Sequence, residues 1–325
     1  MHLYVDVSAL AHSAAHAMRE EEIALGPAQV ALAVVSQVGQ FVRHYRPRRT
    51  YFCLDSPKDR ITWRKAVEAS YKANRAEMYQ DDPQRLMRRQ MADKALQKEI
   101  LELIDLVECP RFQMPHIEAD DIAAALVAMN PGTKGILVTT DKDYWQLINP
   151  TVSFLNPTHQ YRVEMGPNGT LVQHKADGTS EDLGFTPKQH LLIKALHGDD
   201  GDNLDGLCGV GEVGARKAVL EGRASALITE MTGMVTPRKS KKNPSPVPHH
   251  QDAKAIVSKN IAMMDLLNSQ VHGKVRLMME PIEKAGIRSQ RTGFTKLVVW
   301  LEANGIKNEE LARSLSTTFT DQWIS

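Results

Sequence analysis

The stretch IEADDIAAALVAMNPGTKGILVTTDKD, residues 117–143, decides the class of fold. Residues 117–129 place apolar side chains at helical spacing, and the Asn-Pro-Gly turn at 130–132 ends the predicted helix. Residues 136–140 form a short β-rich run that leads into Asp141. Similar runs lie at 3–7 and 50–54, and a helix opened by Pro27 is predicted over 27–45. Strands alternating with helices predict an α/β fold with a mostly parallel central sheet flanked by helices.

Acidic residues mark the ends of all three β-rich runs. Asp6 lies near the end of the first run, Asp55 follows the second, and Asp141 follows the third. In open sheets of parallel strands, ligands bind beside the carboxyl ends of the strands. We therefore expect these three carboxylates to meet at one edge of the sheet.

Further carboxylates occur in the motifs E-A-D-D, T-D-K-D and G-D-D-G-D-N, which begin at residues 118, 140 and 198. Close carboxylates repel unless a cation neutralises them, and oxygen ligands without His or Cys favour Mg²⁺ or Mn²⁺ over Zn²⁺. Two such ions about 4 Å apart would stabilise both the attacking and the leaving oxygen of a phosphoryl transfer. Taken singly, each acid is more typical of a solvated surface, a helix cap or a turn. Taken together, they favour a metal centre.

The glycine-rich stretch 192–220, LIKALHGDDGDNLDGLCGVGEVGARKAVL, has the most specific pattern in the chain. A predicted helix ends at Gly198, an acidic loop follows, and G-V-G-E-V-G precedes a second helix that carries Arg216 and Lys217. Glycines let the backbone approach a phosphate closely, and the N–H groups at the start of a helix face the anion. The stretch therefore predicts a phosphate-binding element, and its loop carbonyls also suit a monovalent cation such as K⁺.

The net charge gives no sign of a nucleic-acid partner, since 40 Lys+Arg nearly balance 39 Asp+Glu and leave +1. The charges are unevenly placed, however. Residues 58–98 carry eleven basic against six acidic residues, a net charge of +5, with Trp63, Tyr71 and Tyr79 interleaved. Residues 236–250, TPRKSKKNPSPVPHH, predict a flexible basic loop. We therefore expect acids and bases on separate surfaces, with the acids gathered at the metal centre.

Three scattered cysteines, Cys53, Cys109 and Cys208, are too few for a disulfide framework and favour a reducing compartment. The N-terminus lacks the basic region of a signal peptide, and no apolar stretch approaches the roughly 18 residues of a membrane span. These features predict a cytoplasmic protein with no membrane partner.

Six motifs in family order resemble the 5′-nucleases of the flap endonuclease superfamily. They cover roughly residues 3–220 and read VDVSAL, FCLDS, SYKANR, IEADDIAA, TTDKDYWQL and GDDGDNLDGLCGVGEVGARKA. The likeness is to the phage 5′–3′ exonuclease branch, which is related to the 5′-nuclease domain of bacterial DNA polymerase I. It implies a PIN-like nuclease fold with a helical arch at about 58–98 and a helix–three-turn–helix at about 192–220. On this basis we expect an α/β nuclease core at 1–185 and a helical DNA-binding region at 186–325.

The resemblance also implies roles for individual residues. One metal site would comprise Asp6, Asp55, Glu118 and Asp120 with Asp121 close by, and a second would comprise Asp141, Asp143, Asp199 and Asp202. Lys72 and Arg75 match the arch-base residues that position the scissile phosphate, and Tyr71 matches a residue that can stack on a base. The duplex backbone would be gripped, with a bound K⁺, by Gly209, Gly211, Gly214, Arg216 and Lys217. No role is implied for Asp200, and Asp6-Val7-Ser8 replaces the family's usual Asp-Gly-Ser.

We predict a Mg²⁺-dependent 5′-nuclease, with Mn²⁺ as a substitute, that cleaves DNA as a 5′–3′ exonuclease or flap endonuclease near single-strand/duplex junctions during replication or repair. The resemblance implies a monomer, and a nuclease without a polymerase module suggests a phage or plasmid-borne system in a bacterial cytoplasm. The balance of exonuclease and endonuclease activity, and cleavage of RNA in RNA–DNA hybrids, stay open.

Two other functions remain as alternatives: a non-catalytic, structure-specific DNA-binding protein of the same fold, and a small-molecule phosphohydrolase, which would leave the arch unexplained. Trp145 is expected in the core, as are Met263, Met264, Leu266 and Leu267. Lys239, Lys241 and Lys242 fit DNA contact and a solvated loop equally well.

Overall fold

The computed structural model describes residues 1–57, 60–75, 82–233, 235–236, 249–250, 252–285 and 293–320. Its strands are β1 His2–Asp6, β2 Arg49–Leu54, β3 Arg111–Gln113, β4 Gly135–Val138, β5 Val152–Asn156, β6 Tyr161–Met165, β7 Leu171–His174, β8 Ser180–Asp182, β9 Gly198–Asp199, β10 Leu204–Asp205, β11 Val235–Thr236 and β12 His249–His250. Its helices are α1 Val7–Ala17, α2 Glu20–Ala24, α3 Pro27–Tyr45, α4 Trp63–Val67, α5 Pro83–Gln97, α6 Glu99–Leu106, α7 Ala119–Met129, α8 Pro187–His197, α9 Glu212–Leu220, α10 Ala224–Met231, α11 Ala253–Met264, α12 His272–Ala285, α13 Gly293–Ala303 and α14 Glu309–Thr320. Two 3₁₀ helices, η1 Ala73–Arg75 and η3 Lys142–Leu147, complete the set used below.

The central sheet has the strand order β3-β2-β1-β4-β5-β6-β7-β8. The pairs from β3 to β5 are parallel, and those from β5 to β8 are antiparallel. The predicted α/β class with a mostly parallel sheet is confirmed, and each of the three expected β-rich runs forms a strand. The antiparallel extension β6–β8 was not predicted, because its short strands mix polar and apolar residues without a clear period.

Side chains of the central strands alternate between two cores, one on each face of the sheet. In β1, Leu3 and Val5 enter one core while Tyr4 enters the other, and all three are at most 1% exposed. Strand β4 follows the same rule, with Leu137 on the side of Tyr4. A strand buried on both faces needs apolar residues at every position, which explains the continuous apolar runs in the sequence.

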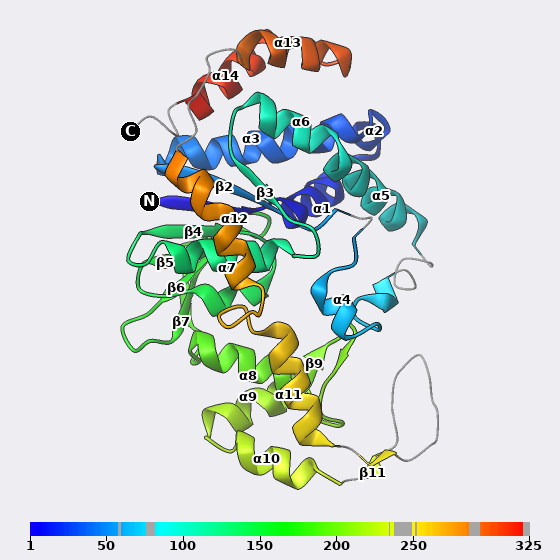
Figure 1. Ribbon diagram of the computed structural model, residues 1–325, viewed down its shortest axis with the longest axis vertical. Helices are drawn as coiled ribbons and strands as arrows, with labels where there is room; N and C mark the ends of the chain where they lie inside the picture. Colours follow the sequence, from blue (N-terminus) through cyan, green and yellow to red (C-terminus); the bar gives the residue numbers. More distant parts are fainter. Residues whose placement is uncertain are drawn as a thin grey trace.

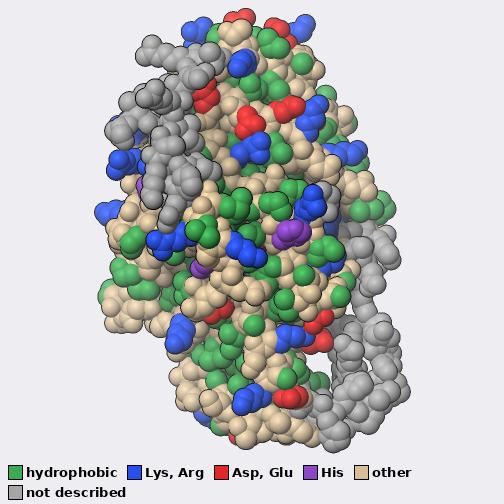
Figure 2. All heavy atoms as spheres, viewed as in Figure 1, with side chains coloured by type: hydrophobic (Ala, Val, Ile, Leu, Met, Phe, Trp, Pro, Cys, Tyr) green, Lys and Arg blue, Asp and Glu red, His purple; other side chains and the backbone are tan. Residues whose placement is uncertain are grey.

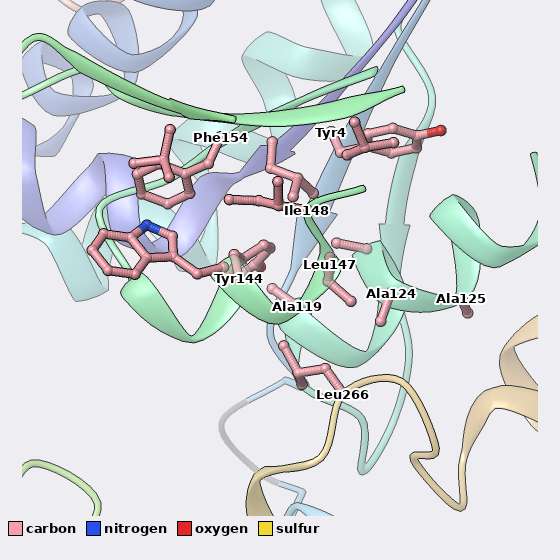
Figure 3. Packing of buried hydrophobic residues seen from close by; sticks show 14 of the residues in the cluster. Tyr4, Ala119, Ala124, Ala125, Tyr144, Leu147, Ile148, Phe154 and Leu266 are labelled. Carbon is pink, nitrogen blue, oxygen red and sulfur yellow. The ribbon is translucent and has the colours of Figure 1, made fainter. Parts of the chain in front are cut away.

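Helices cover both faces of the sheet (Figure 1). The core on one side packs the sheet against α1, α3, α5 and α6, and the core on the other side packs it against α7, η3 and α8. Figure 3 shows Tyr144, Leu147 and Ile148 of the η3 region lying between the sheet and α7. Trp145 is 5% exposed and packs edge-on against Phe154, so its predicted place in the core is confirmed.

The last helices return to the N-terminal part of the chain. Helices α13 and α14 pack on α6 and α3, whereas α9 and α10 lie at the opposite end of the molecule (Figure 1). The predicted division at residue 185 therefore differs from the packing, because the apolar faces of α13 and α14 complete the core of the N-terminal unit. Of the four apolar residues expected in the core at 263–267, three are buried, but Leu267 is 52% exposed, since it follows the end of α11.

The arch segment and the basic loop are described only in part. Helices α4 and α5 and η1 occupy most of 58–98, while 58–59 and 76–81, including Tyr79, lie outside the described residues. Strands β11 and β12 pair at the two ends of the predicted loop, and Lys239, Lys241 and Lys242 lie outside the described residues. Within the described ranges, no helix has the length and apolar character needed to span a bilayer.

Candidate active site

The three strand-end acids lie on adjacent strands, as the sequence predicts. Asp6 ends β1, Asp55 follows β2, and Asp141 follows β4, and these strands are neighbours in the order β2-β1-β4. Thr139 links two of them, because its hydroxyl donates to Asp6 Oδ2 at 2.9 Å and accepts from the Asp141 N–H at 3.1 Å. The prediction that parallel strands bring these carboxylates to one edge is confirmed.

The E-A-D-D motif meets these acids at the start of α7. The N–H of Ala119 donates to Asp55 Oδ1 at 2.9 Å, which holds the helix N-terminus against the end of β2. Glu118 is the N-cap residue, and Asp120 lies in the first turn. The start of α7 therefore lies beside the end of β2, but no three carboxylates of the set expected for a first metal ion come within 4.8 Å of one another in the described part of the chain.

Arg64 of α4 lies buried among the carboxylates of this motif. Its Nη1 is 2.6 Å from Glu118 Oε2, 3.2 Å from Asp120 Oδ1 and 3.0 Å from Asp121 Oδ2, and its side chain is 2% exposed. Its Nε donates to the carbonyl of Met263 at 2.8 Å. Burial opposes ionisation, but the three carboxylates outweigh it and raise the pKa of Arg64 well above its usual value. Sequence reasoning missed Arg64, because nothing in the basic segment distinguishes it from its neighbours.

Asp121 is sealed inside the protein. It is 0% exposed, and its carboxylate accepts hydrogen bonds from Trp63 Nε1 at 2.7 Å and Ser269 Oγ at 2.6 Å in addition to Arg64. The metal-ligating role predicted for Asp121 does not fit this position, since its oxygens are already occupied by protein donors and do not face solvent. Asp121 instead ties α4 and the segment before α12 to α7.

A second group of acids is open. One carboxylate oxygen from each of Asp143, Asp199 and Asp202 lies within 4.8 Å of the others, and all three side chains are half-buried. Asp141 adjoins this group, because its Oδ1 accepts from the Asp143 N–H at 2.8 Å. Hard carboxylate oxygens at this spacing fit a divalent ion such as Mg²⁺ or Mn²⁺. The predicted second metal site therefore corresponds to a real cluster.

Lys194 of α8 inserts its ammonium into the second group. Its Nζ contacts Asp143 and lies 2.7 Å from Asp199 Oδ2. Burial opposes the charge on the Lys194 ammonium, but Asp143 and Asp199 outweigh it and raise the pKa of Lys194. Sequence reasoning missed Lys194, although its place about one helical turn before Asp199 was an available signal.

Lys72 lies between the two groups of acids, and Arg75 lies beside the second group. Lys72 Nζ is 2.8 Å from Glu118 Oε1 and 3.8 Å from Asp202 Oδ1. Arg75 Nη2 is 3.0 Å from the same Asp202 oxygen. The expected separation of acids and bases is thus wrong at the site, because four cationic side chains lie directly among the carboxylates. Figure 2 shows the same mixture of basic and acidic side chains over the described part of one face.

Tyr71 does not offer a ring for stacking. It is 3% exposed, packs against Leu204 and Met263, and has the Lys72 ammonium 4.7 Å from its ring centroid. Its hydroxyl lies 3.1 Å from Glu118 Oε2 and 3.0 Å from Asp202 Oδ2. The predicted role in base stacking is therefore not supported by this arrangement, in which Tyr71 connects the two groups of acids.

Crowding shifts the pKa values of these acids in opposite directions. Burial and then the nearby Asp55 charge raise the pKa of Asp6 to about 6. Desolvation of its carboxylate and then the nearby Asp143 charge raise the pKa of Asp141 to about 7. Because residue 141 is exposed, we attribute this rise mainly to the Asp143 charge. Burial opposes ionisation of Glu118, but Lys72 and Arg64 outweigh it and lower the pKa of Glu118 to about 2. Asp6 and Asp141 thus have less cationic charge beside them than Glu118 has, and a divalent ion would supply the missing charge.

The glycine-rich element presents bare backbone to the surface. A Cβ added at Gly209 or Gly211 would meet no protein atom within 4 Å, so the packing of the chain does not require glycine there. At Gly198 and Gly206, by contrast, a Cβ would lie 2.3 Å from the Gly206 N and 2.1 Å from the His197 backbone, at the base of the β9–β10 hairpin. Gly198 and Gly206 are therefore required by the packing of the chain, whereas Gly209, Gly211 and Gly214 leave open space for a ligand to approach the backbone closely.

The two basic residues of α9 differ in availability. Arg216 contacts the carbonyl of Leu183 and places its guanidinium 5.2 Å from the centroid of the Phe185 ring. Lys217 is 72% exposed and has a loose contact with Glu221 at 3.9 Å. Lys217 is therefore exposed at the position where a phosphate contact is predicted, whereas Arg216 is engaged by the protein.

Comparison with known proteins agrees with this geometry. The sequence profile of the 5′–3′ exonuclease N-terminal resolvase-like domain matches residues 1–176, more than half of the chain. The chain belongs to the 5′–3′ exonuclease family.

Relatives within this family include two DNA polymerases I. That of Thermus aquaticus is 34% identical over 173 residues, which cover 52% of this chain and 18% of the relative. That of Mycobacterium bovis is 37% identical over 109 residues, which cover 33% of this chain and 11% of the relative. This 5′–3′ exonuclease family member thus matches less than a fifth of the length of these polymerases.

Solved structures with the same fold come from bacteriophage T5. The T5 D15 flap endonuclease in a pseudo-enzyme-product complex with DNA and metal ions has a TM-score of 0.61 at 21% identity, covering 87% of this chain and 99% of the other. The T5 5′-exonuclease with bound divalent zinc ions has a TM-score of 0.59 at 21% identity, covering 87% of this chain and 98% of the other. At this identity the two structures show that the family member shares their fold.

Proposed function

We propose that this chain is a divalent-metal-dependent 5′-nuclease that hydrolyses DNA phosphodiesters near single-strand/duplex junctions. The observation that carries the proposal is the position of Lys72 and Arg75: the Lys72 ammonium lies between Glu118 and Asp202, and the Arg75 guanidinium lies beside Asp202. A phosphodiester is an anion, so the cationic side chains of Lys72 and Arg75, beside a group of acids that favours metal ions, suit it as a substrate. The names of the relatives, an exonuclease and a flap endonuclease in complex with DNA, support the same class of substrate.

The second group of acids suits the metal ions that this reaction would use. Asp143, Asp199 and Asp202 offer only oxygen ligands, and bound Mg²⁺ or Mn²⁺ would supply Lewis acidity for phosphodiester hydrolysis. Lys72 and Arg75 would exchange their contacts with Asp202 for hydrogen bonds to the phosphate oxygens. Donors fixed beside the reacting phosphate stabilise the charge that develops in the transition state.

The glycine-rich element would hold the duplex. Exposed backbone at Gly209 and Gly211 and the ammonium of Lys217 could approach phosphates of one strand, with K⁺ bridging protein and phosphate. Binding of this kind depends on charge and not on base sequence, so affinity should fall steeply with salt concentration. The proposal extends to a monomer acting in the cytoplasm, with RNA–DNA hybrids as a second substrate to be tested.

A second candidate is a non-catalytic protein that binds the same DNA structures. It is favoured by Lys194 and Arg64, because they neutralise the carboxylates without a metal ion. A protein with such internal pairs would bind DNA and leave it intact.

Cleavage of a 5′-labelled flap substrate with Mg²⁺ or with EDTA separates the two candidates. The nuclease proposal expects cleavage in Mg²⁺, none in EDTA, and no cleavage by Asp202→Ala despite DNA binding close to that of the wild type. Asp177→Ala is the matched control, because the Asp177 carboxylate accepts hydrogen bonds from Thr179 in an exposed turn. DNA that stays intact with Mg²⁺ and wild-type protein would support the binding protein instead.

A further inference from the structure

Two asparagines join the base of the arch to the acidic loop of the candidate site. We call residues 70–75 the arch base and residues 199–203 the acidic loop. Asn203 Nδ2 donates to the carbonyl of Ser70 at 2.7 Å. Asn74 Nδ2 donates to the carbonyl of Asp200 at 2.6 Å. The arch base and the acidic loop thus each supply one side-chain donor and one carbonyl acceptor to the contact.

These two hydrogen bonds are made by arch-base residues on either side of Lys72, and Arg75 directly follows Asn74. Lys72 and Arg75 lie within the arch base, and the Lys72 N–H donates to the carbonyl of Asp202 at 2.9 Å. Arg75 Nε contacts the carbonyl of Gly201 at 3.3 Å. The acidic loop thus holds the backbone that carries Lys72 and receives the Arg75 side chain directly.

The backbone at this contact is constrained. Lys72 and Asn203 both have a φ of +56°, a left-handed conformation that residues with a side chain rarely adopt. Such conformations persist only where surrounding contacts hold them. The bonds made by Asn203 and by the Lys72 N–H are contacts of this kind, since they tie the two left-handed residues to the opposite segment.

The acidic loop is itself rigidly joined to the glycine-rich element. The β9–β10 hairpin closes around Gly198 and Gly206, which leave no room for a Cβ, and the Leu207 N–H donates to the carbonyl of Leu196 at 2.7 Å. The arch base is therefore positioned relative to the surface proposed to hold the duplex.

We propose that Asn74 and Asn203 are positioning residues, which hold the Lys72 and Arg75 cations at the reacting phosphate through the contact between the arch base and the acidic loop. The inference rests on the proposed nuclease function. It also assigns a use to the 200–201 backbone: the carbonyls of Asp200 and Gly201 accept bonds from Asn74 and Arg75, whereas no function follows for the Asp200 carboxylate.

The test compares Asn203→Gly and Asn74→Ala with the wild-type chain on a 5′-labelled flap substrate. Glycine keeps the left-handed backbone at 203 and removes only the side-chain bond. Single-turnover cleavage in Mg²⁺ should fall about 10-fold for each variant, because small displacements of positioned groups cost up to about 100-fold in rate. The Kd for the same DNA, measured in EDTA, should stay within about twofold of the wild type, since no DNA contact is removed.

Double variants distinguish a positioning role from a merely structural one. Asn203→Gly should lose most of its effect in a Lys72→Ala chain, and Asn74→Ala should lose most of its effect in an Arg75→Ala chain. Asn304→Ala is the matched control: it also removes an amide–carbonyl bond, 2.8 Å long, but between Trp300 and the residue that follows α13. Its cleavage rate should equal that of the wild type.

Several results would overturn the inference while leaving the nuclease proposal intact. These are wild-type cleavage rates in both asparagine variants, a rise in Kd that accounts for the whole loss, or a full effect in the Lys72→Ala and Arg75→Ala chains. Urea unfolding of each variant shows whether it is folded, and Asn203→Asp, which keeps the size of the side chain but not its donor, should reproduce the loss of Asn203→Gly. If the wild-type chain does not cleave the substrate, the nuclease proposal itself fails.

Discussion

Replacing Asp6 by Asn should change how the stability of the protein depends on pH. Asp6 is 7% exposed, and its carboxylate caps α1 by accepting from the Ala9 N–H at 3.0 Å. Asn can make the same cap, so the substitution removes the charge and keeps the local structure. Since the pKa of Asp6 is raised from 3.8 to about 6, the folded protein takes up this proton before the unfolded chain does as the pH falls. The Asp6 side chain therefore adds stability at low pH and loses it as the pH rises through 6.

The size of the effect follows from the two pKa values. Between pH 8 and pH 5, a folded pKa of about 6 and an unfolded pKa of 3.8 give about 1.4 kcal/mol in favour of the folded state. The difference between wild type and Asp6→Asn isolates this amount, because buried histidines such as His190, whose lowered pKa acts in the opposite direction, are common to both chains.

Urea unfolding in EDTA, followed by tryptophan fluorescence, measures the difference. The free energy of unfolding of the wild type minus that of Asp6→Asn should increase by about 1.4 kcal/mol from pH 8 to pH 5. At pH 8, Mg²⁺ should stabilise the wild type more than the variant, since an ion bound at 100 times its Kd adds about 2.7 kcal/mol. A difference that stays constant or decreases toward pH 5 would refute the argument that Asp6 is a buried carboxylate without a cation.

Three further predictions concern other parts of the site. Lys72→Ala should lower single-turnover cleavage at least about 100-fold, since it removes a cation beside the reacting phosphate, and an unchanged rate would exclude Lys72 from the active site. Arg64→Met should lower the free energy of unfolding by about 3–5 kcal/mol in urea, because three carboxylates lose their buried partner, and a loss under about 1 kcal/mol would contradict this. Gly206→Ala should prevent stable folding, since its Cβ would lie 2.1 Å from the His197 carbonyl oxygen. Gly211→Ala should lower the free energy of unfolding by only about 1 kcal/mol but weaken duplex binding. Equal stability of the two variants in urea would show that the β9–β10 hairpin relaxes around the added Cβ.

Local patterns predicted much of the fold. The helix at 27–45 is α3 with the same ends, because Pro27 opens it and its apolar residues recur at helical spacing. The strands β1, β2 and β4 were found because they are buried on both faces and are continuously apolar. The strands β6–β8 were missed because one side faces solvent, as at the exposed β8, and their short polar runs resemble loops.

The acids were predicted more completely than their partners. Asp6, Asp55 and Asp141 follow from strand ends, since parallel strands deliver their carboxyl ends to one edge. Arg64 and Lys194 were not predicted as site residues, because the sequence does not show whether an arginine or a lysine is buried or exposed to solvent. The role assigned to Tyr71 failed for the same reason: its burial depends on Leu204 and Met263, far away in the chain.

The sequence by itself determined the helix α3, the strands β1, β2 and β4, and the meeting of three carboxylates at one edge of a parallel sheet. These follow from short-range periodicity and from the geometry of strands, which any local segment carries. Only the tertiary structure decided which acids are open and which are sealed. Asp121 is closed off by Trp63, Arg64 and Ser269, up to 148 residues away. Asp143, Asp199 and Asp202 are only half-buried, and one oxygen of each lies within 4.8 Å of the others, with Lys194 and Arg75 as partners that an ion would displace. Burial and charge pairing depend on contacts between distant segments, so the chemistry of each carboxylate was settled by packing.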